Sequence, residues 1–166
     1  MKGPEVSLHH LQTALTMELT TVNQYMLQAQ FLADWGVHRL AARMVEEIAE
    51  ERGHADRFLE RLIFLEGTPD MQTLDEIVQP QSVRSIFNKQ LDMEIEARRV
   101  YDKAARECQE AGDVGTFELF MTILKDEEEH IDFAEEQLNL MEMMGDQLYI
   151  ARQVDSVAKT GHHDDD

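Results

Sequence analysis

Helix-breaking residues are concentrated at a few points of this 166-residue chain, and the long stretches between them constrain its fold more than any other feature. Glycine and proline mark turns and end helices. Apart from those near the two ends of the chain, the breakers lie at residues 35–36, 67–70, 80–82, 112–115 and 145–146, and Gly53 is the exception inside a stretch. We therefore expect four long helices, with Ser82 as the N-cap of the third and Gly145 just after the fourth. A shorter helix is expected over residues 146–158.

Each long stretch carries apolar residues at intervals of three and four, the spacing of a helix with one buried face. These stripes run from Leu8 to Leu32, from Leu40 to Leu65, from Val83 to Cys108 and from Phe117 to Met141. Four amphipathic helices of this length predict an all-α four-helix bundle. We expect one domain over residues 1–158 and a disordered tail over residues 159–166.

The lengths of the connections predict the topology. Short connections join the first helix to the second and the third to the fourth, so each pair should be antiparallel. The 15 residues from 67 to 81 can extend over about 50 Å, whereas a helix of about 28 residues is about 42 Å long. This connection can therefore cross the whole bundle, which leaves the second and third helices parallel.

Charge and composition exclude several classes of protein. The chain has 34 acidic and 15 basic residues and a net charge of −19, so we expect no binding to nucleic acid, which requires a basic surface. No apolar run approaches the roughly 18 residues of a membrane span. The N-terminus lacks the apolar stretch of a secretory signal, which makes the cytoplasm the expected location. The lone cysteine, Cys108, excludes a disulfide framework and a cysteine-rich zinc site.

Four glutamates interrupt the apolar stripes at positions where core residues belong. Ionised carboxylates are rarely buried unless they are paired or bound to a metal. Each of the four has apolar residues on both sides within its stripe, so fraying of a helix end cannot expose it. They are Glu18, Glu51, Glu94 and Glu127.

The glutamates belong to a repeated pattern. The interval from Glu18 to Glu51 is 33 residues, and so is the interval from Glu94 to Glu127. A histidine follows three residues after the second glutamate of each pair, and a tyrosine follows seven residues after the first. These residues are His54, His130, Tyr25 and Tyr101. The chain is therefore interpreted as two copies of one helical hairpin, brought around one centre by a pseudo-twofold axis.

The repeated spacing predicts a site for two metal ions. Glutamate and histidine three residues apart lie on the same face of a helix, so each E-x-x-H can offer a carboxylate oxygen and an imidazole nitrogen. A carboxylate has two oxygens, so some of the four can bridge two ions, and two divalent ions would balance the four charges. Without metal, the carboxyl groups would repel one another and hold protons. Mixed carboxylate and imidazole ligands suit iron or manganese.

Several of these residues have a simpler interpretation. A single E-x-x-H is often a surface ion pair, but two of them on core stripes at matching intervals favour a dinuclear site. Tyr25 and Tyr101 are either ordinary core aromatics or hydrogen-bond donors to ligand carboxylates. Glu47 is either a support of the site from outside the ligand set or a solvated residue at the edge of its stripe. Glu46 and Glu50 are either surface charges or transient metal stations.

The chain resembles the bacterioferritins, a family of ferritin-like di-iron proteins, along nearly all its length. The similar stretches include residues 1–3, 18–25, 35–36, 54–67 and 123–132. The resemblance implies a hollow shell of two dozen subunits, in which Fe(II) is oxidised by oxygen or peroxide and stored as ferric mineral. It also implies a ferredoxin-type protein as a reductant.

The resemblance assigns two iron ions per subunit to six ferroxidase ligands, which are Glu18, Glu51, His54, Glu94, Glu127 and His130. It implies that Glu51 and Glu127 bridge the two ions and that the other two glutamates are terminal. The spacing of the residues by itself leaves open which pair bridges.

One position departs from the family pattern. Bacterioferritins bind haem between two subunits through a methionine that directly follows the ligand glutamate of the second helix, and this chain has Arg52 there. Arginine is permanently cationic and offers no lone pair to iron. We therefore expect no haem in a homo-oligomeric shell, or a mixed shell in which a haem-binding bacterioferritin subunit supplies the methionine.

Two other functions are compatible with a helical bundle of this kind. A di-iron redox enzyme without storage, such as a rubrerythrin-like peroxidase, would usually carry a cysteine-rich rubredoxin module, which a single cysteine excludes. The other is a non-catalytic bundle with an incidental metal site.

Overall fold

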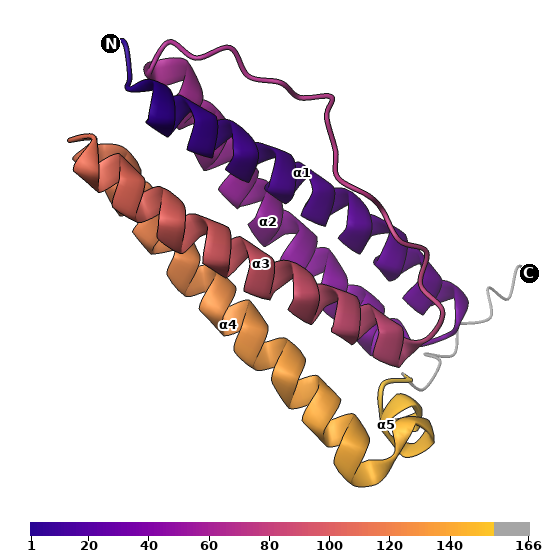
Figure 1. Ribbon diagram of the computed structural model, residues 1–166. Coiled ribbons are helices and arrows are strands. Elements are labelled where there is room, and N and C mark those ends of the chain that lie inside the picture. The colour runs from indigo at the N-terminus through magenta and orange to yellow at the C-terminus, as the bar shows by residue number, and fades with distance from the viewer. Residues whose placement is uncertain (155–166) are drawn as a thin grey trace, which may run out of the picture.

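The computed structural model describes residues 1–154 and contains five helices within them. They are α1 (Glu5–Asp34), α2 (His38–Phe64), α3 (Val83–Glu110), α4 (Val114–Met144) and α5 (Asp146–Arg152). The first four form a bundle, and α5 turns across one end of it (Figure 1). The predicted all-α fold class is therefore confirmed. The predicted tail and residues 155–158 of the predicted domain lie outside the described residues.

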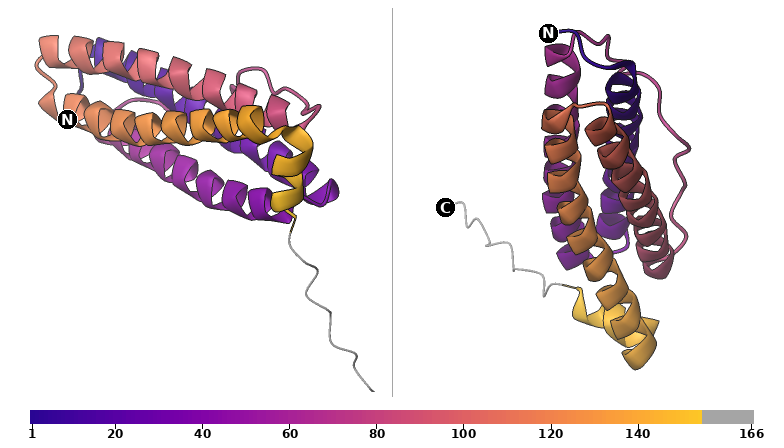
Figure 2. Two further views of the ribbon diagram at one scale, coloured as in Figure 1. Left: turned by 90° about the horizontal axis from the view of Figure 1, so that it is seen from below. Right: turned by 60° about the vertical axis from the view of Figure 1, so that its left-hand side comes forward.

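The bundle consists of two antiparallel hairpins, α1–α2 and α3–α4, which residues 65–82 connect (Figures 1 and 2). This connection runs along α1, so that α2 and α3 are parallel as predicted. Gln12 donates to the carbonyl of Asp70 at 3.0 Å and accepts from its N–H at 2.8 Å. Gln24 forms the same pair of hydrogen bonds with Val78, each at 2.8 Å. The extended segment has no neighbouring strand to pair with, so these two side-chain amides satisfy some of its backbone groups.

The predicted helix ends are mostly confirmed. Ser82 caps α3 by accepting a hydrogen bond from the N–H of Ser85 at 3.0 Å, and the Ser85 hydroxyl accepts from the N–H of Ser82 at 2.9 Å. Gly145 follows α4 with a φ of 80°, a conformation that glycine adopts without a steric penalty.

The predicted end of the short helix is wrong, because α5 ends at Arg152 and not at residue 158. The N–H of Gln153 donates to the carbonyl of Ile150 and closes the last turn. The carbonyl of Gln153 then accepts a hydrogen bond from the N–H of Arg39 in the first turn of α2. N–H groups in that position have no partner within their own helix. Gln153, the residue that follows α5, therefore also caps the first turn of α2.

Two apolar clusters fill the bundle and leave a polar layer between them. One cluster contains Phe58, Tyr101 and Phe120, and the other contains Tyr25 and Phe87. Nearly all residues of the predicted stripes are buried, and those only partly covered are Leu8, Val22, Phe117 and Leu138. None of the helices within residues 1–154 combines the length and the hydrophobicity needed to cross a lipid bilayer.

Candidate metal centre

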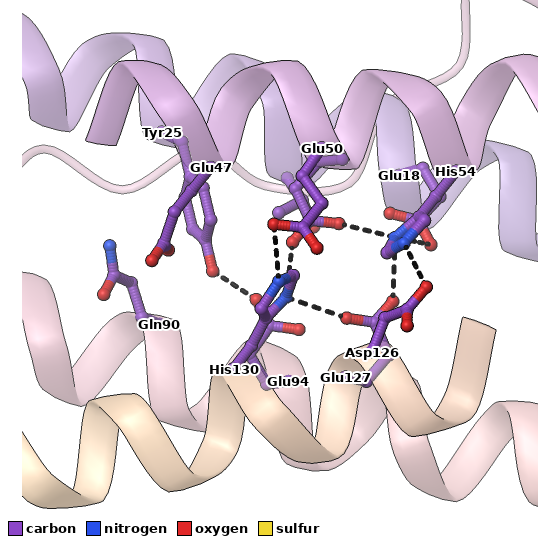
Figure 3. A network of polar contacts seen from close by, with 12 residues as sticks. Glu18, Tyr25, Glu47, Glu50, His54, Gln90, Glu94, Asp126, Glu127 and His130 are labelled. Atoms are coloured by element: carbon purple, nitrogen blue, oxygen red, sulfur yellow. Dashed lines mark hydrogen bonds and ion pairs between the residues drawn. The ribbon is translucent and has the colours of Figure 1, made fainter. Parts of the chain in front are cut away.

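The polar layer contains the six side chains that the sequence predicts as ligands. α1 and α3 each contribute a glutamate, and α2 and α4 each contribute a glutamate and a histidine one turn apart (Figure 3). They converge because each lies on the stripe that its helix turns inward. None of them is more than 6% exposed: Glu18, Glu51, His54, Glu94, Glu127 and His130.

These side chains form two overlapping groups whose ligand atoms lie within 4.8 Å of one another. The first group is Glu18, Glu51, His54 and Glu127, and the second is Glu51, Glu94, Glu127 and His130. Two glutamates belong to both groups, which is the arrangement expected of carboxylates that bridge two cations. They are the pair that the family resemblance assigns to the bridge.

Each shared carboxylate directs one oxygen towards each histidine. In Glu51, Oε2 lies 3.1 Å from Nδ1 of His54, and Oε1 lies 2.8 Å from Nδ1 of His130. In Glu127, the corresponding distances are 3.4 Å from Oε1 to His54 and 3.2 Å from Oε2 to His130. The Nδ1 atoms are therefore the nitrogens that face the centre.

Several buried polar atoms of the centre have no hydrogen-bond partner among the described residues. They are Oε1 of Glu51, Oε2 of Glu127 and both ring nitrogens of His130. The short contacts of His130 Nδ1 with the carboxylates therefore lack hydrogen-bond alignment. Leaving a buried polar group unpaired costs about 1–3 kcal/mol, and a cation between these atoms would satisfy them. Oxygen and imidazole donors of this kind fit iron.

A phenol holds each of the two outer glutamates. Tyr101 donates from its hydroxyl to Oε1 of Glu18 at 2.5 Å, and Tyr25 donates to Oε1 of Glu94. Both tyrosines are fully buried. The structure therefore contains the hydrogen bonds that sequence analysis left open, and they orient the carboxylates that belong to only one group each.

Burial and mutual repulsion set the protonation of the metal-free centre. Burial, reinforced by the nearby charges of Glu127 and Glu51, raises the pKa of Glu18 and of Glu94 well above the usual range. Burial also opposes ionisation of the shared pair, but the close contacts with the two histidines outweigh it and lower the pKa of both Glu51 and Glu127. Without metal, protons therefore favour the outer carboxyls.

The histidines respond in the opposite direction. Burial by itself lowers the pKa of an imidazole, but close contact with the carboxylate oxygens of Glu127 and Glu51 and their negative charge outweigh it and raise the pKa of both His54 and His130. Two imidazolium groups thus balance the two ionised carboxylates of the metal-free core.

Glu47 lies beside the centre and outside both ligand groups. It is 3% exposed, so it is a buried residue and not a solvated one. Its Oε1 accepts a hydrogen bond from Nε of Arg43 at 3.0 Å, and burial raises its pKa. Glu46 is exposed and pairs with the same arginine at 3.3 Å.

Sequence analysis missed Asp126, which contacts the outer nitrogen of a predicted ligand. Its Oδ2 lies 3.2 Å from Nε2 of His54 (Figure 3). Glu50 occupies the matching position on the other hairpin, with Oε2 3.4 Å from Nε2 of His130. Each of the two acids directly precedes a shared glutamate in the sequence, so the repeated pattern already contained the signal.

Comparisons with known proteins agree with the fold. A family model described as a ferritin-like domain matches residues 8–144. The bacterioferritin of Brucella melitensis is 41% identical to this chain over 149 residues, which cover 90% of this chain and 92% of the relative. This chain belongs to the bacterioferritin family. Two further bacterioferritins, from Rhodobacter capsulatus and Mycobacterium tuberculosis, are 37% and 35% identical over 89% and 92% of this chain and 91% and 96% of their own.

Cation binding to this centre should release protons. The pKa values of His54 and His130 are raised to about 10 and about 12, so both imidazoles hold protons at neutral pH without metal, and the raised pKa values of Glu18 and Glu94 favour their protonated forms. A cation must displace those protons, so its affinity should rise between about pH 6 and pH 8. Calorimetric titration with Zn²⁺ in buffers of different protonation enthalpy measures the release. A pH-independent affinity without proton release would contradict the expected protonation.

Proposed function

We propose that this chain oxidises Fe(II) at a dinuclear centre and stores the ferric product inside a hollow shell of two dozen subunits. The observation that carries the proposal is the pair of overlapping ligand groups that share Glu51 and Glu127. Iron is the substrate, and two Fe(II) ions supply the two electrons that reduce oxygen to hydrogen peroxide or hydrogen peroxide to water. A centre for two ions therefore matches a two-electron oxidant.

The side chains around the centre prepare this reaction. The shared carboxylates keep two cations close together, which supplies the proximity that a two-electron step needs. Tyr101 and Tyr25 hold Glu18 and Glu94 at the two ends of the centre. Four carboxylates balance two divalent ions, so binding leaves no net charge buried in the bundle. Close packing of the helices keeps bulk water away.

Surface properties support assembly into a shell. Apolar side chains near the end of α4 and around α5 are exposed, namely Met143 at 75%, Leu148 at 50% and Val154 at 47%. Exposed apolar groups that gather at one end of a protein mark contacts with other chains. The shell consists of this chain alone or of this chain and a haem-binding bacterioferritin subunit. It lies in the cytoplasm, and a ferredoxin-type protein serves as its reductant.

Replacing Glu51 or Glu127 with alanine should strongly reduce Fe(II) oxidation, since either change removes oxygen ligands from both cation positions. We expect the initial rate in stopped-flow measurements to fall by at least about tenfold, while circular dichroism shows intact helices. The matched control is Glu60→Ala, which changes an exposed glutamate of α2 that belongs to neither ligand group. Wild-type oxidation rates in both site variants would contradict the proposed centre.

Truncation after Met144 should weaken the shell without unfolding the bundle. It removes α5, in which Tyr149 packs against Phe87 and donates from its hydroxyl to Oε1 of Gln137 at 2.7 Å. Size-exclusion chromatography should show smaller particles, and circular dichroism should show the four long helices. Leu148→Ser in the full chain tests the exposed apolar face alone. Complete shells of unchanged thermal stability after truncation would count against this role of α5.

Haem is a cofactor that the family implies, and the residue at its ligand position does not fit it. Arg52 directly follows Glu51 and is exposed on α2. Its guanidinium has donors only and no lone pair for iron. We infer that a shell of this chain alone binds no haem through position 52, while the six iron ligands inside the bundle are unaffected.

Arg52→Met should allow haem uptake, because methionine supplies the thioether that arginine lacks. The expected result is a Soret band in the variant and none in the wild-type shell, when both are produced with haem available. Fe(II) oxidation should be the same in both proteins. A Soret band of one haem per two subunits in the wild-type shell would refute the inference.

A further inference from the structure

The outer nitrogens of the two histidines face acidic residues that come from the opposite hairpin. His54 of α2 meets Asp126 of α4, and His130 of α4 meets Glu50 of α2 (Figure 3). The interval from Glu50 to Asp126 is 76 residues, the same as the interval from His54 to His130. The two contacts are therefore counterparts in the repeat, and each hairpin supplies the outer partner of the other.

The two contacts differ in their geometry. Nε2 of His54 and Oδ2 of Asp126 form a hydrogen bond of 3.2 Å. Nε2 of His130 lies 3.4 Å from Oε2 of Glu50, but it has no hydrogen-bond partner. The side chain of Glu50 is one methylene longer, and it is 48% exposed compared with 36% for Asp126. The repeat is therefore symmetric in its ligands and asymmetric just outside them.

A carboxylate on the outer nitrogen of a metal-binding histidine has a known physical effect. It fixes the tautomer and the orientation of the ring, and it makes the inner nitrogen a stronger donor. In this chain, Asp126 accepts a hydrogen bond from Nε2 of His54, so Nδ1, the nitrogen that faces the centre, is the one left to bind a cation once its own proton is displaced. His130 lacks an aligned partner at either nitrogen, so its ring is oriented less strictly.

We propose that Asp126 is a positioning residue. By orienting His54, it makes the cation site between Glu18 and His54 the tighter of the two and the first to fill. The position bounded by Glu94 and His130 is the weaker one. This inference rests on the proposed dinuclear centre and adds an order of loading to it.

A titration of the metal-free shell with Zn²⁺ tests this order without relying on iron oxidation. Asp126→Ala should weaken the tighter of the two binding steps by about 10–100-fold, the usual effect of losing such an outer partner. Glu50→Ala is the matched control at the counterpart position of the repeat. Both variants remove one carboxylate from a partly exposed site near a histidine, so a difference between them reports the hydrogen bond and not the charge. Glu50→Ala should leave the affinity of the tighter Zn²⁺-binding step unchanged.

Two further measurements separate positioning from a structural role. Asp126→Asn retains an oxygen acceptor of the same size, so it should recover part of the lost affinity, and thermal unfolding of the metal-free variants should match the wild type. Anomalous diffraction from crystals that hold one Co²⁺ per subunit should place the ion between Glu18 and His54.

The proposal is overturned if Glu50→Ala weakens the tighter step as much as Asp126→Ala does, or if the first ion lies between Glu94 and His130. These outcomes leave the dinuclear centre intact. A wild-type shell that binds fewer than two Zn²⁺ per subunit would instead contradict the dinuclear centre itself.

Discussion

The burial of four carboxyl groups in the middle of a helical bundle is the constraint on which the rest of this structure depends. Ionised groups in such a position need opposite charge or a cation, because transfer from water to a protein interior is costly. The bundle concentrates them in one polar layer, with an apolar cluster on either side. Two imidazoles, two phenols and protons on the outer carboxyls compensate the layer when no metal is bound.

The two hairpins produce the centre by repetition, and they differ in what surrounds it. Glu47 and Ile123 are counterparts in the repeat, 76 residues apart. Glu47 is a buried acid that pairs with Arg43 near the surface, whereas Ile123 belongs to an apolar cluster. Gln90 and Ala14 differ in the same way, since the glutamine donates to Gln28 within the core. One half of the centre therefore adjoins polar side chains, and the other adjoins a closed apolar core.

The same helices that bury the centre leave other surfaces for contacts with further chains. The extended connection lies along α1 and is held by the two glutamine side chains that bond its backbone. At the other end, Arg84 of α3 forms a hydrogen-bonded ion pair with Asp146 of α5, at 2.5 Å between Nη2 and Oδ1. This contact fixes the direction in which α5 leaves the bundle and presents its exposed apolar side.

The sequence by itself determined the four long helices, the parallel placement of α2 and α3, and the identity of the six candidate ligands. These features follow from periodicity, breaker positions and repeated intervals, which are local properties of a chain. Only the tertiary structure decided that Glu51 and Glu127 face both histidines, that Asp126 reaches His54, and that Gln153 ends α5 by bonding the N–H of Arg39. Those contacts depend on how the helices rotate and cross, and no spacing within one helix encodes the partner that another helix brings.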